Sequence, residues 1–163
     1  MKVTRIKNQI IIEHLDDFLA EMLRRIPASA VPGDNKAAGE RLFTKPEATD
    51  GKLAADWKLY VEPELRHLFQ SALETVADDL KKIRKIKSEE EGDEYGLKIP
   101  LIHVDAWLNA TNQARLVLSA IHEFADEELA GEIPVTITNS LELALFQVHF
   151  YGFLQECFLR ILE

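Results

Sequence analysis

The sequence predicts a mostly α-helical protein, a compact helical bundle with a small N-terminal β-hairpin. Two long apolar patterns with helical spacing, at residues 65–83 and 140–162, predict the bundle. β-branched residues on both sides of Asn8 and Gln9 predict the hairpin, with its turn at those two residues. Because 163 residues is a common size for one domain and 47 % of them are hydrophobic, we expect residues 1–163 to form a single domain.

After the hairpin, the chain is predicted to form one helix followed by a long loop. Asp16 and Asp17 precede apolar residues at helical spacing, and acidic residues favour the start of a helix. Pro27 is expected to end this helix, because proline cannot continue the backbone hydrogen bonds. Residues 28–51 contain several prolines and glycines and little periodicity, so they are predicted to be a loop.

The middle of the chain is predicted to contain two helices and a charged loop. The first helix runs from about Lys52 to Val61, and Pro63 either kinks it or opens the next one. The second follows the apolar pattern of residues 65–83 and is expected to reach Lys87. The acidic residues between Ser88 and Gly96 predict a solvated loop.

The next helix is predicted at residues 105–125, after a short extended piece at 99–102. Its main apolar face is formed by Trp107, Ala110, Ala114, Val117, Leu118 and Ile121. The opposite face is polar but contains Leu108 and Leu116, so we expect another segment to pack there as well.

The last helix, at residues 140–162, is apolar over most of its circumference. Such a helix is typical of the buried centre of a bundle, or of one side of a dimer interface. The central position is the first choice, and a homodimer through this helix is the alternative.

Charge and cysteine content limit the classes of function. The formal net charge is −9, and residues 101–163 contain only two basic residues, Arg115 and Arg160, which argues against binding to nucleic acid. No apolar stretch is long enough to span a membrane. The single cysteine, Cys157, cannot form an internal disulfide, and the N-terminus does not read as a signal peptide, so a cytoplasmic location is expected.

The sequence contains no recognisable catalytic motif, and we expect neither a metal nor another cofactor. His122 and Asp126 are one helical turn apart with Glu123 nearby, but a second histidine and a third ligand are missing. Asn112 and Arg115 also lie one turn apart. They could hold a carboxylate or phosphate, or they could join helices by hydrogen bonds to Gln155 or Glu156 of the last helix; the structural role is favoured.

Two blocks carry a resemblance to a known family. Residues 106–118 contain Trp107-Leu108, then Asn112, then Arg115-Leu116, and residues 151–160 contain Gln155-Glu156 after a short aromatic stretch. These blocks resemble the bacterial family called domain of unknown function 2017. The resemblance implies a compact helical domain with no assigned activity. It also implies that six residues are marked as a ligand or interaction face: Trp107, Asn112, Arg115, Leu116, Gln155 and Glu156.

Together these observations favour a non-catalytic binding or regulatory protein that acts on another protein, or on itself, through a helical surface. The alternative is a small-ligand-binding protein or an enzyme with its site around Asn112 and Arg115.

Overall fold

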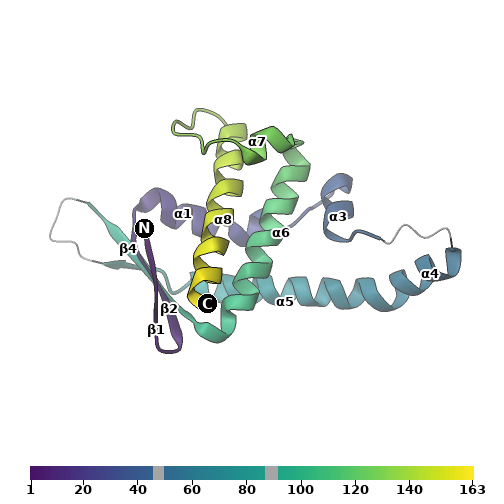
Figure 1. Cartoon of the computed structure of the whole chain (residues 1–163), viewed down its shortest axis with the longest axis horizontal. Helices are drawn as coiled ribbons and strands as arrows, with labels where there is room; N and C mark the ends of the chain where they lie inside the picture. Colours follow the sequence, from purple (N-terminus) through teal and green to yellow (C-terminus); the bar gives the residue numbers. More distant parts are fainter. Residues whose placement is uncertain (46–49, 87–91) are drawn as a thin grey trace.

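The computed structural model describes residues 1–45, 50–86 and 92–163 of the chain. Helices make up most of these residues, and four strands among them form one antiparallel sheet at one end of the molecule (Figure 1). The prediction of a mostly α fold is confirmed, and so is the N-terminal hairpin. The hairpin supplies two of the four strands, so the sheet is larger than predicted.

The sheet has the strand order β1-β2-β4-β3, with neighbouring strands antiparallel. Its strands are β1 (Lys2–Ile6), β2 (Gln9–Leu15), β3 (Arg84–Ile86) and β4 (Glu94–Pro100). Ile6 pairs with Gln9, so the hairpin turn lies at Lys7 and Asn8, one residue earlier than predicted. Lys7 adopts the left-handed conformation, with φ of 54°, which suits a two-residue hairpin turn.

Strands β3 and β4 lie where the sequence predicts other structure. The long helix is predicted to reach Lys87, but it ends at Leu80 and the chain continues into β3. Strand β4 covers the end of the predicted loop and the start of the predicted extended piece, and residues 88–91 of that loop lie outside the described residues. All three side chains of β3 are exposed, so no apolar alternation marks it as a strand.

Three short helices follow the hairpin: α1 (Asp17–Arg24), α2 (Ile26–Ser29) and α3 (Lys36–Leu42). Pro27 lies in the first turn of α2, where a missing N–H costs no helical hydrogen bond. The prediction of a loop at residues 28–51 is wrong for residues 36–42, which form the helix α3. The side chain of Asn35 caps this helix by accepting a hydrogen bond from the N–H of Ala38, and Ala38 and Leu42 are buried.

The predicted kink before Pro63 is present as one turn of π-helix. The chain forms α4 (Gly51–Asp56), the π-helical η1 (Trp57–Val61) and α5 (Glu62–Leu80) in succession. A proline ring collides with the carbonyl four residues earlier, which here belongs to Leu59. The wider π turn avoids this collision, and the N–H of Glu62 donates to the carbonyl of Trp57, five residues back.

The second half of the chain forms a 3-10 turn and three helices: η2 (Leu101–His103), α6 (Val104–His122), α7 (Asp126–Ala130) and α8 (Ser140–Leu162). The sequence predicts that α6 continues to about Ala125. It ends earlier because Glu123 takes the left-handed conformation, with φ of 53°, which stops the helix.

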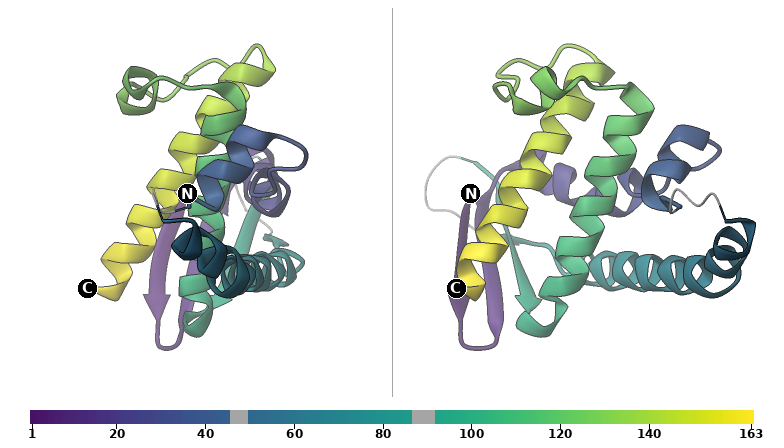
Figure 2. Two further views of the ribbon diagram at one scale, coloured as in Figure 1. Left: turned by 90° about the vertical axis from the view of Figure 1, so that its right-hand side faces the viewer. Right: turned by 45° about the vertical axis from the view of Figure 1, so that its right-hand side comes forward.

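The central helix is α6 and not α8, so the prediction that the last helix forms the buried centre of the bundle is wrong. Helices α2, α3, α5 and α8 all pack on α6, whereas α8 lies along one side of it (Figures 1 and 2). One face of α8 is buried and the other leaves Leu141, Phe153, Leu159 and Leu162 exposed. An apolar circumference shows that a helix is hydrophobic, but not how many neighbours cover it.

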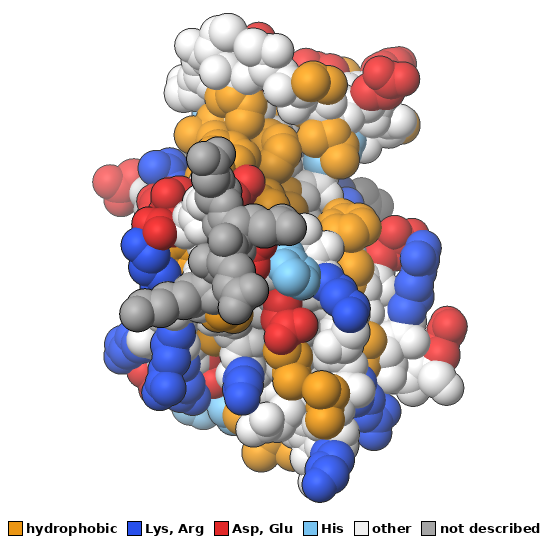
Figure 3. Space-filling model, turned by 90° about the vertical axis from the view of Figure 1, so that its left-hand side faces the viewer, with side chains coloured by type: hydrophobic (Ala, Val, Ile, Leu, Met, Phe, Trp, Pro, Cys, Tyr) orange, Lys and Arg blue, Asp and Glu red, His pale blue; other side chains and the backbone are white. Residues whose placement is uncertain are grey.

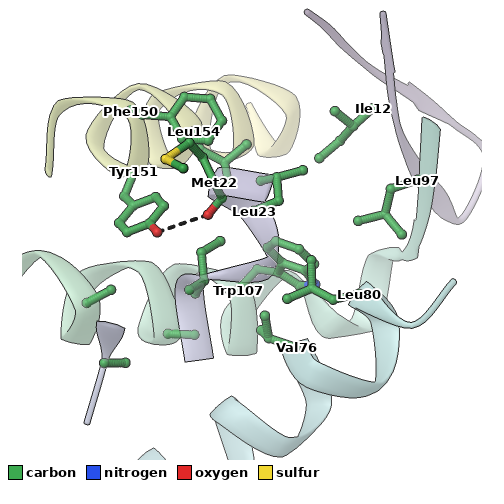
Figure 4. Close-up of a cluster of buried hydrophobic side chains, with 14 of the residues drawn as sticks. Ile12, Met22, Leu23, Val76, Leu80, Leu97, Trp107, Phe150, Tyr151 and Leu154 are labelled. Atoms are coloured by element: carbon green, nitrogen blue, oxygen red, sulfur yellow. Dashed lines mark hydrogen bonds between the residues drawn. The ribbon is translucent and has the colours of Figure 1, made fainter. Parts of the chain in front are cut away.

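The core lies between α1, α5, α6, α8 and one face of the sheet (Figure 4). Tyr151 is fully buried there, and its hydroxyl donates a 3.0 Å hydrogen bond to the carbonyl of Met22. Gln147 in turn donates to the Tyr151 hydroxyl over 2.9 Å. Within the described ranges, none of the helices combines the length and the apolar content that a membrane crossing requires.

Candidate functional site

The structure separates the six residues that the sequence marks as one face. Trp107 is fully buried on the side of α6 that faces α5. Arg115 and Gln155 are half-buried and bonded to each other between α6 and α8. Asn112 and Glu156 are exposed, and Glu156 lies 3.7 Å from Arg160 of its own helix. The six residues therefore do not form one site.

The second face of α6 is covered, as predicted, but by two different neighbours. Leu108 packs at the edge of the main core. Leu116 packs against a small cluster that includes Ala38 and Leu42 of α3. The face is therefore divided between α8 and α3.

Arg115 joins α6 to α8. Its Nη1 donates to Oε1 of Gln155 over 2.7 Å, and Nε2 of Gln155 donates to the carbonyl of Leu108 over 3.2 Å. The guanidinium lies against Gly152, where a Cβ atom would come within 3.3 Å of the Arg115 Cζ. The predicted hydrogen-bonded link between the helices is present with Gln155, while Asn112 forms no side-chain hydrogen bond to the described residues. The Arg115 Nε is buried without a described partner.

A second polar cluster, centred on Asp79, was not predicted. Asp79 is fully buried near the end of α5. Its Oδ1 accepts from Lys82 Nζ at 2.8 Å, and its Oδ2 accepts from His103 Nδ1 at 2.8 Å and from Trp107 Nε1 at 3.1 Å. Burial raises the pKa of Asp79, but the hydrogen bonds from Lys82, His103 and Trp107 outweigh it, so the net pKa lies below the ordinary value.

The Asp79 cluster ties three elements together. Both carboxylate oxygens are occupied by donors from the protein, one from the turn after α5, one from η2 and one from α6. The cluster therefore stabilises the junction of α5 and α6 through charge-assisted hydrogen bonds. A signal was present in the sequence, since Asp79 falls in the apolar pattern of its helix three residues after Val76, whereas Asp78 is exposed.

The described residues contain no group of three or more His, Cys, Asp or Glu side chains that could hold a metal ion. His122, the residue considered as a ligand, stacks against Phe124 with ring centroids 5.6 Å apart.

A group of exposed apolar side chains lies on a projecting segment that we call the arm, residues 51–71. The arm comprises α4, η1 and the first half of α5, and it extends away from α6 and α8 (Figures 1 and 2). Neither α4 nor η1 contains a buried residue, and the buried positions of α5 begin at Ala72. Four large apolar side chains of the arm are more than half exposed: Leu53, Leu59, Tyr60 and Leu68.

A shallow groove of about 480 Å³ runs along the arm. It is lined by three apolar residues, Val61, Leu65 and Leu68, and by three polar ones, Glu64, His67 and Ser71. Exposed apolar surfaces of this kind often mark binding sites, because covering them with a partner removes apolar area from water and is favourable.

The surface at the end of the molecule opposite the arm carries many charged side chains. Lys and Arg side chains mix there with acidic and apolar ones (Figure 3). A hollow of about 550 Å³ on the sheet is lined by Lys82, Arg84, Lys85 and Lys98 among others. Lys82 is paired with Asp79 and Lys85 with Asp93, so part of this positive charge is neutralised within the chain.

These features define a class: a mostly helical protein built beside a small antiparallel sheet, with an apolar helical arm outside its core. The family model described as Domain of unknown function (DUF2017) matches residues 9–162, and the chain belongs to that family. No curated protein and no solved structure matches the chain.

Proposed function

We propose that the protein is a non-catalytic binding or regulatory protein that recognises a protein partner through the arm. The observation that carries this proposal is the exposure of Leu53, Leu59, Tyr60 and Leu68 on the arm, in which residues 51–71 contain no buried side chain. Removing exposed apolar side chains from water is favourable, so the arm gains free energy from a partner that covers it. A cytoplasmic location is part of the proposal, supported by the lone cysteine.

The alternative, a small-ligand site around Asn112 and Arg115, has less support. The Arg115 guanidinium donates to Gln155 and lies against Gly152, so it already joins α6 to α8. The Asp79 cluster, which is chemically the most distinctive part of the molecule, is also occupied by donors from the protein itself.

Leu59→Asp should remove partner binding, because it places a charge at the centre of the apolar arm surface. The purified protein, Leu59→Asp and the control Leu159→Asp serve as baits in an extract of the native organism, with captured proteins quantified by mass spectrometry. Leu159 is a matched control, since it is also an exposed leucine but lies on α8. We expect a specific partner to be retained by the wild type and Leu159→Asp and reduced at least about tenfold with Leu59→Asp.

Both substituted side chains are exposed in the structure, and circular dichroism should show an unchanged fold for both variants. A partner lost with Leu159→Asp and retained with Leu59→Asp would place binding on α8 and contradict the proposal. Equal capture by all three baits would also contradict it.

A further inference from the structure

We propose that the protein also binds a small, uncharged and largely apolar molecule in a hollow between α3, α5 and α6, where the side-chain oxygen of Gln113 accepts a hydrogen bond from it. The hollow has a volume of about 370 Å³, which lies within the range of small-ligand sites. It is on the opposite side of α5 from the groove of the arm, since Arg66 and Gln70 line the hollow and Leu68 lines the groove. This inference goes beyond the proposed function of the arm and does not depend on it.

The walls of the hollow are mostly apolar and come from segments far apart in the chain. Helix α3 lies beside α6 (Figure 2), and Leu42 and Phe43 at its end line the hollow together with Phe69 and Leu73 of α5. The Phe43 and Phe69 rings have centroids 5.6 Å apart, and Leu42 and Leu73 are buried. Val31, before α3, is a further apolar lining residue. These walls favour an apolar molecule, because contact with them removes its surface from water.

Gln113 supplies a polar group to the hollow. The residue is only 2 % exposed although its side chain is an amide, and it lines the hollow. Its Nε2 donates to the carbonyl of Phe69 over a long distance of 3.5 Å, and its Oε1 accepts no hydrogen bond from the described residues. The Oε1 atom is not sealed inside the protein as the Nε of Arg115 is, so a donor in the hollow can reach it. A ligand that donates there would satisfy an otherwise unpaired acceptor.

The charges around the hollow indicate an uncharged ligand. Among the described residues that line it, Arg66 is the one with a charged side chain. Its Nε and Nη2 donate to Glu62 over 3.1 and 2.7 Å, and its guanidinium lies over the Phe43 ring, 4.0 Å from the centroid. The charge of Arg66 is therefore already compensated by Glu62. A charged ligand would lose its hydration in the hollow without gaining an opposite charge.

Water alone would use only part of this site. A water molecule can donate to Gln113, but it gains nothing from contact with the apolar walls. A molecule with a hydroxyl or N–H group on an apolar body satisfies the Gln113 oxygen and also covers the walls. Phenol is a simple probe with both features, and toluene has a similar size and shape but no donor.

Titration of the full chain with phenol and with toluene, followed by nuclear magnetic resonance, tests the site. We expect saturable binding of phenol with a dissociation constant of about 1 mM, as is usual for so small a ligand, and shifts centred on the amides of Val31, Phe43 and Gln113. In Gln113→Leu, the ratio of the affinity for phenol to that for toluene should fall at least about fivefold, because the phenol hydroxyl is then buried without an acceptor.

Asn112→Leu is the matched control for Gln113→Leu. It replaces the neighbouring amide of α6, which is exposed and does not line the hollow, so the affinity ratio should equal that of the wild type. Val31→Trp is a second test. Val31 is 53 % exposed, so a larger side chain there should narrow the hollow without disturbing the core, and it should weaken the binding of both probes.

An unchanged affinity ratio in Gln113→Leu would overturn the inference. So would the absence of saturable phenol binding to the wild type, or shifts centred on Leu59 and Tyr60 of the arm. If Gln113→Leu does not fold, Val31→Trp decides, and undiminished phenol binding by that variant would contradict the site. The bait comparison with Leu59→Asp tests the arm separately from all of these results.

Discussion

Replacing Asp79 with alanine should lower the free energy of unfolding by about 3 kcal/mol. The carboxylate is fully buried and accepts hydrogen bonds from Lys82, His103 and Trp107. Its removal leaves the fully buried indole N–H of Trp107 without an acceptor, and this desolvation cost is not recovered. Urea denaturation followed by circular dichroism measures the change.

Asp78→Ala is the matched control for Asp79→Ala. Asp78 is the neighbouring carboxylate, but its side chain is exposed, and among the described residues its one side-chain partner is Lys81. We expect no measurable change for this variant. If both substitutions lowered the free energy of unfolding equally, the effect would come from removing a negative charge from α5 and not from the buried Asp79 cluster.

The stabilisation by Asp79 should also depend on pH. The folded-state pKa of Asp79 lies below its ordinary value of 3.8, so the folded state favours the ionised form. This contribution is complete above the unfolded-state pKa and is lost as the pH falls through the folded-state pKa. The difference in unfolding free energy between the wild type and Asp79→Ala should therefore shrink below about pH 4.

Trp107→Ala should lower the free energy of unfolding by about 4 kcal/mol. Trp107 is fully buried, packs edge-to-face against Phe158 with ring centroids 5.8 Å apart, and donates to Asp79. The substitution leaves a large cavity beside the central helix and removes one hydrogen bond of the Asp79 cluster. Because the two residues share that bond, the double variant with Asp79→Ala should lose less than the sum of the single losses.

Asn112→Ala provides the contrast on the same helix. Asn112 is exposed and forms no side-chain hydrogen bond with the described residues, so its replacement should change the unfolding free energy by less than about 0.5 kcal/mol. An equally small change in unfolding free energy for Trp107→Ala would contradict the burial of Trp107 in the core.

Helical periodicity in the sequence predicts α6 and α8 and most of α5, because each has an apolar pattern longer than 15 residues. It does not predict β3 or the start of β4. Arg84–Ile86 is a strand of only three residues, and all three are exposed, so no alternation of buried and exposed side chains marks it in the sequence. The short helix α3 was also not predicted, since it is only seven residues long and contains Gly39.

The helical wheel of α6 predicts the link between Arg115 and Gln155, because two leucines on a polar face require a neighbour. The same reasoning cannot locate the arm. The apolar pattern that begins at Leu65 continues into a true core position at Val76, so the sequence does not show where the core ends and the exposed surface begins. Periodicity identifies the apolar face of a helix, but only the three-dimensional structure shows what covers it.

The central claim is that the protein binds a partner through its arm and not through the surface around Asn112 of α6. Site-specific photo-crosslinking in cells of the native organism tests it most directly, with a photoreactive amino acid at position 60 in one strain and at position 112 in another. Tyr60 and Asn112 are both exposed, so both probes are accessible. We predict a discrete covalent adduct with a partner protein from position 60, and none from position 112. An adduct from position 112 with none from position 60 would contradict the claim.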